Sequence, residues 1–79
     1  MKPDYERMLI ELEAEYREYL EEHEGLKRAL AASLGTAAEP GARVAVIEST
    51  RRLASVNADL SNVHGMLLRS QMKELNDEG

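Results

Sequence analysis

The chain has 79 residues and a formal net charge of −5, and it contains no Phe, Trp or Cys. This length allows one small domain at most, and the absence of cysteine excludes disulfide bonds and thiolate metal sites. The acidic balance argues against nucleic acid as a partner, since such binding depends on basic side chains that neutralise phosphates.

The apolar content is small and scattered. No stretch approaches the ~20 apolar residues that a membrane-spanning helix needs, and the first residues lack the apolar region of a secretory signal. We therefore expect no membrane insertion and a cytoplasmic location. Hydrophobic residues make up 43% of the chain, but many of them are alanines and only 4% of the residues are aromatic. A core this thin is marginal for a freestanding domain, so we expect a partner or self-association.

The first predicted helix covers residues 4–34. Pro3 suits a first helical turn, Asp4 complements the positive end of the helix dipole, and Gly35 is placed to end the helix in the left-handed conformation. Apolar residues then alternate at intervals of four and three, which is typical of a heptad seam. The seam consists of Tyr5, Leu9, Leu12, Tyr16, Tyr19, His23, Leu26 and Leu30, with Met8, Leu20 and Leu34 widening it.

Glycine and proline concentrate in residues 35–41, where we expect a turn. Thr36 and Glu39 have the spacing of a capping box, but a residue that precedes proline is biased away from helical geometry. Pro40 is therefore the favoured start of a second helix over residues 41–75. The seam of this helix consists of Val46, Ser49, Leu53, Val56, Leu60, Val63 and Leu67.

The short connection folds the two helices back on each other as an antiparallel pair. Residues 4–24 are rich in acidic side chains and residues 42–73 carry more basic than acidic ones, so the same arrangement brings opposite charges together. With a hairpin centred near residue 38, His23 lies opposite Leu53. We expect an all-α protein, a single helical-hairpin domain over residues 1–79 that a partner or dimerisation completes into a bundle.

A second stripe runs along the second helix, on a face that the first helix does not reach. Small residues in its middle permit close approach of another helix, and apolar residues at its ends give that helix something to bury. We interpret this stripe as a protein interface; the alternative is an alanine-rich face that only favours helix formation. The candidate interface residues are Ile47, Ala54, Ala58, Ser61, Gly65, Leu68, Met72 and Leu75.

Residues able to perform chemistry are few. His23 and His64 lie ~16 Å apart along the predicted hairpin and do not share a metal. No Glu is followed by His three residues later, as a di-iron bundle requires, and the serines lack the neighbours of a nucleophile. We expect no enzyme activity, no catalytic residue, no metal and no cofactor.

The chain resembles the small helical-hairpin co-chaperones of bacterial type III secretion systems. The resemblance rests on length, the Glu/Leu-rich first helix, the short Pro/Gly turn and the second helix rich in Ala, Ser, Val and Leu. It implies an adaptor that binds a helical-repeat chaperone and, through it, the needle subunit of the secretion system. Residues 63–75 are also loosely similar to the C-terminal helix of needle subunits, although the acidic first helix departs from their pattern.

Two further hypotheses come from other classes of protein. One is a homodimeric four-helix bundle with a structural or regulatory role. The other is an acidic decoy that mimics nucleic acid through glutamates such as Glu15, Glu18 and Glu22. A solvated acidic face is the simpler interpretation of the same residues.

Overall fold

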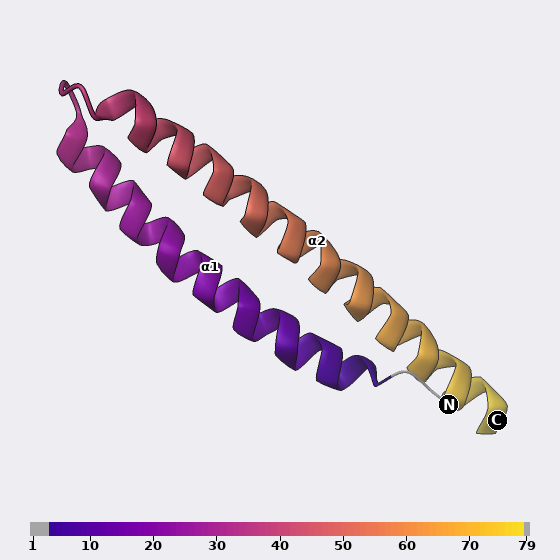
Figure 1. The fold of residues 1–79 in the computed structure, drawn as a ribbon. Coiled ribbons are helices and arrows are strands. Elements are labelled where there is room, and N and C mark those ends of the chain that lie inside the picture. The colour runs from indigo at the N-terminus through magenta and orange to yellow at the C-terminus, as the bar shows by residue number, and fades with distance from the viewer. Residues whose placement is uncertain (1–3, 79) are drawn as a thin grey trace.

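The computed structural model describes residues 4–78 as two α-helices, α1 (Tyr5–Ser33) and α2 (Glu39–Glu78), which a short turn connects. The helices lie side by side and run antiparallel, with the turn at one end and the start of α1 and the end of α2 at the other (Figure 1). Residues 4–78 contain no strand. The all-α helical hairpin expected from the sequence is confirmed.

Asp4 caps the start of α1. Its carboxylate accepts a hydrogen bond of 3.0 Å from Arg7 N, and its carbonyl oxygen accepts one of 3.1 Å from Met8 N. The acid thereby satisfies a backbone donor that the helix leaves free, and Glu6 in the first turn adds a favourable charge at the positive end of the dipole. The expected role of Pro3 lies outside the described residues.

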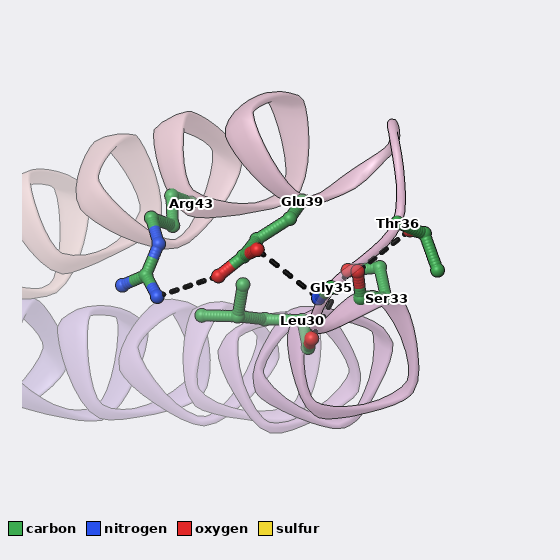
Figure 2. A network of polar contacts seen from close by, with 6 residues as sticks. All are labelled: Leu30, Ser33, Gly35, Thr36, Glu39 and Arg43. Carbon is green, nitrogen blue, oxygen red and sulfur yellow. Dashed lines mark hydrogen bonds and ion pairs between the residues drawn. The ribbon is translucent and has the colours of Figure 1, made fainter.

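Gly35 ends the first helix as expected, with a φ of 77° in the left-handed region. Leu34 before it has φ −57° and ψ 129°, and Thr36 N donates to Ser33 O at 3.0 Å. These values are those of a type II turn, which requires a positive φ at its third residue. The Thr36 hydroxyl donates to the same carbonyl oxygen at 2.6 Å and closes the end of α1 (Figure 2).

The start of α2 differs from the expectation. The helix begins at Glu39 rather than at residue 41, and it ends at Glu78 rather than at 75. Ala42 N donates to Ala38 O at 3.1 Å, which makes Glu39 the first helical residue and Pro40 the second. Glu39 is therefore helical, although a residue before proline is biased away from helical geometry.

The carboxylate of Glu39 explains this earlier start. It accepts a hydrogen bond of 3.1 Å from Gly35 N and pairs with Arg43 at 2.8 Å, one turn further along α2 (Figure 2). The Thr36 hydroxyl accepts from Ala38 N at 3.3 Å. A capping box would instead join Thr36 and Glu39 reciprocally, so the turn uses the same residues in a shifted pattern.

The heptad seams of both helices meet along the length of the hairpin. Every predicted seam residue is buried or half-buried, but only Leu9, Val56 and Val63 are buried apolar residues among those described. The three residues expected to widen the seam lie at its edge, where Met8 and Leu20 are just over a third exposed and Leu34 more than half. The interior is a single row of side chains.

His23 and Glu22 fix how the two helices align. His23 lies opposite Ser49, with Nδ1 and Oγ 3.1 Å apart, and Glu22 pairs with Arg52 at 2.9 Å. The expectation that His23 faces Leu53 was wrong by about one helical turn. The cause is the shorter turn: α1 stops at Ser33 and α2 starts at Glu39, so the hairpin is centred about two residues earlier.

Candidate protein-interaction surface

A second row of residues runs along α2 on the side away from α1, and we call it the outer row. Its members from Val44 to Gly65 each lie two positions from a seam residue, and two positions correspond to about 200° around a helix with 3.6 residues per turn. The remaining members continue the same spacing beyond the end of the seam. The outer row therefore points almost directly away from α1. It consists of Val44, Ile47, Arg51, Ala54, Ala58, Ser61, Gly65, Leu68, Met72 and Leu75.

All eight candidate interface residues lie in this row. Seven of them are exposed in the hairpin, and Gly65 is half-buried. The large side chains are the most open: Leu68 is 58% exposed and Leu75 is 69% exposed. The hairpin thus brings the candidates together on one continuous face and covers none of the apolar side chains at its ends.

Arg51 occupies the row between Ile47 and Ala54, although it was not among the interface residues predicted from the sequence. With Arg51 included, the steps along the row alternate between three and four from residue 44 to residue 75 without a break. This spacing is a second heptad repeat on the same helix. Following the steps of three and four through a charged residue identifies Arg51 as a member of the repeat, whereas considering only apolar and small residues misses it.

Gly65 and Arg69 shape the C-terminal half of the outer row. Arg69 Nε donates to Gly65 O at 3.2 Å, and a Cβ on Gly65 would lie 3.3 Å from Arg69 Nη2. The guanidinium therefore lies over the glycine, where a side chain would crowd it. Because the arginine stem is flexible and its contact is with its own helix, this group can move aside for a docking helix.

The outer face of α1 is different in character. At the positions that correspond to the outer row it carries charged residues such as Arg17, Glu21 and Arg28. Several acidic residues of α1 are engaged in ion pairs: Glu11 with Arg7 at 3.4 Å, Glu24 with Lys27 at 3.3 Å, and Glu22 with Arg52 across the helices. An apolar helix would bury charge on this face, so α2 is the better candidate for docking one.

A shallow groove on the side of the hairpin contains a further apolar surface. Met8 and Leu12 of α1 face Val63 and Met66 of α2 there. Its rim is acidic or polar and consists of Glu11, Glu15, Asp59 and Asn62. Met8 was predicted from the sequence to widen the seam, but its side chain is 39% exposed and lines this groove.

The elongated shape leaves much of the surface open. The molecule measures 65 × 17 × 14 Å and has a radius of gyration of 18.5 Å, whereas a compact chain of this length would have one of about 12 Å. Its accessible surface is 6099 Å², against roughly 4,800 Å² for a typical folded monomer of 8.8 kDa. The excess, on the order of 1,300 Å², is larger than the ~800 Å² that each partner buries in a standard interface.

The described residues offer no site for metal chemistry. Residues 4–78 contain no group of three or more His, Asp or Glu side chains placed to hold a metal ion. His23 is hydrogen-bonded to Ser49 in the seam, and His64 is exposed on α2. Within the same residues, neither helix has a segment apolar enough over a sufficient length to cross a bilayer.

Comparison of the chain with protein-family models, curated proteins and solved structures finds no match.

Proposed function

We propose that this protein is a non-enzymatic protein–protein interaction module that docks a helix of another protein along the outer row of α2. The observation that carries the proposal is the second heptad repeat, which points away from α1 and whose members are all exposed except the half-buried Gly65. A helix with apolar residues on two opposite faces buries both only when it lies between two other helices. The hairpin supplies one of these helices.

The resemblance to type III secretion co-chaperones gives this module a biological setting. In that setting the protein acts in the cytoplasm as a small adaptor, and its partners are a helical-repeat chaperone and a needle subunit. Such partners are themselves helical, so they present the apolar ridges that a heptad row accepts. The thin interior of the hairpin fits a chain that gains stability when a partner helix covers α2.

Two substitutions in the middle of the outer row test the proposal. Ala58→Arg and Ser61→Arg point away from the seam, so circular dichroism should show an intact hairpin. Each places a long charged side chain where the docking helix approaches, and burying an unpaired charge in an interface is strongly unfavourable. Association should fall at least tenfold, or ~1.4 kcal/mol.

The control is Ala14→Arg, which places the same side chain on the outer face of α1, where Ala14 is exposed. Binding is measured to the chaperone and needle subunit of a type III secretion system, and self-association is measured by sedimentation. If every association of the two outer-row variants stays at the level of the parent protein while the hairpin is intact, the outer row is a solvated face and the proposal is wrong.

A further inference from the structure

We infer that the outer row binds the outer row of a second copy of this chain, with the two α2 helices antiparallel, to form a symmetric four-helix dimer. The inference rests on the proposed function, because it names the occupant of the same face. It is carried by the order of residue sizes along the row, the placement of charges beside the row and the area left open.

The order of residue sizes is the same from either end of the row. Bulky apolar residues occupy both ends, and small residues occupy the middle from Ala54 to Gly65. A two-fold axis between residues 59 and 60 pairs each member of the row with another member, since the steps of three and four are mirrored about that point. Ala58 then faces Ser61 of the second copy, and Ile47 faces Met72 of the second copy.

This arrangement suits two helices that cross at an angle. Crossing helices approach most closely at one point and separate toward their ends. Small residues at the crossing permit a short interaxial distance, and the larger residues at the ends fill the widening gap. A two-fold symmetric interface requires a surface complementary to itself, which the mirrored order provides.

The charges beside the row fit the same register. Glu48 and Arg69 each directly follow a member of the outer row, Ile47 and Leu68, and so lie on the same edge of it. The two-fold axis sets Glu48 of each copy level with residue 71 of the other, which is two residues, or about 3 Å along the helix, from Arg69 on the edge where the two helices meet. Within residues 4–78 neither side chain makes an ion pair, and Arg69 folds back onto the carbonyl of Gly65. The dimer would give both groups a partner of opposite charge, twice over by symmetry.

The other ways of pairing two copies are less favourable. A parallel pair would set each member of the row against its own copy, so that Arg51 faces Arg51. Docking α2 against the outer face of α1 would bury charges such as Glu21 and Arg28. In the antiparallel α2 pair Arg51 is the one charged member of the row, and its stem can cover Leu68 of the second copy while its guanidinium reaches solvent.

The open area is sufficient for such a dimer. Each copy exposes on the order of 1,300 Å² more than a typical monomer of its mass. A standard stable interface buries about 800 Å² per partner. The outer row runs from residue 44 to residue 75, a length of about 47 Å at a rise of 1.5 Å per residue.

A charge exchange between Glu48 and Arg69 tests the inference by sedimentation equilibrium. The parent protein should be a dimer at micromolar concentration. Glu48→Arg alone, or Arg69→Glu alone, creates two like-charge contacts per dimer and should raise the dissociation constant about tenfold. The double variant restores two ion pairs with reversed polarity, and its dissociation constant should return to within about threefold of the parent.

Two variants on α1 serve as matched controls. Glu21→Arg changes the net charge as Glu48→Arg does. Arg17→Glu matches Arg69→Glu, because Arg17 Nε also donates to a carbonyl oxygen four residues earlier, Glu13 O, at 3.4 Å. Neither control should alter dimerisation, and all variants should remain helical by circular dichroism.

The inference is wrong if the parent protein is still monomeric at about 100 µM, 100-fold above the concentration at which it should dimerise. It is also wrong if the double variant dimerises no more strongly than the single variants. The proposed function is separated from it by Ala58→Arg. If the parent is monomeric but Ala58→Arg still abolishes binding to a secretion chaperone or needle subunit, only the second copy is excluded as occupant. If Ala58→Arg changes no association at all, both proposals fail.

Discussion

His23 Nδ1 lies 3.1 Å from Ser49 Oγ and forms a polar layer inside a seam that is otherwise mostly apolar. Ser49 is only 1% exposed, so its hydroxyl has no access to water and depends on this one partner. Sliding either helix by a turn would separate the two groups and leave a buried hydroxyl unsatisfied, at a cost of about 1–3 kcal/mol. The pair therefore selects the register of the hairpin, as single polar residues do in coiled coils.

Removing one or both members of this pair should have opposite effects. Ser49→Ala leaves the imidazole without its partner and should lower the free energy of unfolding by about 1 kcal/mol. His23→Leu combined with Ser49→Ala replaces the polar layer with an apolar one and should recover that loss or exceed the parent. Urea unfolding of the single and double variants at one protein concentration measures both. A double variant less stable than Ser49→Ala would contradict this role of the pair.

Neighbouring residues of α1 test which face is inside. Leu9 is 8% exposed and Ile10 is 65% exposed. Leu9→Ala removes a packed side chain and should cost about 2–3 kcal/mol, near the lower end of the usual range because the thin interior can partly collapse. Ile10→Ala is the control and should change the unfolding free energy by less than about 0.5 kcal/mol. Similar losses in thermal or urea unfolding would mean that the seam is misassigned.

The heptad pattern was sufficient to predict the hairpin and its buried side. The seams from Tyr5 to Leu30 and from Val46 to Leu67 followed from apolar spacing, because only one face of each helix can meet the other. The alignment of the helices did not follow, since it depends on where each helix ends to within one or two residues. Glu39 is helical although it precedes proline, because its carboxylate binds both Gly35 and Arg43.

The candidate surface was predictable in outline for the same reason. A second row of small and apolar residues on α2 is visible in the sequence, whereas its full extent through Arg51 and the position of Arg69 over Gly65 required the structure. Neither the sequence nor the hairpin alone names the molecule that covers this surface. We infer a second copy from the mirrored order of residue sizes along the row and from the charges of Glu48 and Arg69.

Two glycines should respond to alanine with opposite signs. Gly35 has a φ of 77°, a conformation that costs an L-residue about 1–2 kcal/mol, so Gly35→Ala should destabilise the hairpin by that amount. Gly25 lies inside α1, with open space around the position of a Cβ. Gly25→Ala should raise the unfolding free energy by about 0.5–1 kcal/mol through higher helix propensity. Thermal unfolding of both variants checks the prediction, and equal signs would contradict the assigned helix end.

Glu39 should make the turn sensitive to acid. The hydrogen bond from Arg43, followed by that from Gly35 N, holds the pKa of the Glu39 carboxyl below its usual value. A lowered folded-state pKa stabilises the fold above the ordinary value of about 4.3 and loses that contribution as the pH falls through the folded-state pKa. Glu39→Gln should therefore lower the melting temperature at pH 7, and the difference from the parent should shrink in acid.

The control for this titration is Glu21→Gln on the outer face of α1. Glu21 is exposed and makes no ion pair within residues 4–78, so its substitution should leave the melting temperature nearly unchanged at pH 7. A loss in Glu39→Gln that stays constant from pH 7 to about pH 3 would show that the carboxylate charge does not support the turn.

The most direct test of the outer row is whether it becomes covered as the protein assembles. The chain has no cysteine, so Ala58→Cys and Ala14→Cys each introduce one thiol, the first in the outer row and the second on the outer face of α1. Their rates of reaction with a maleimide are measured over increasing protein concentration. The Ala58→Cys thiol should react at least tenfold more slowly in the dimer while the Ala14→Cys thiol keeps its rate. Equal rates for both thiols at every concentration would contradict the burial of this face.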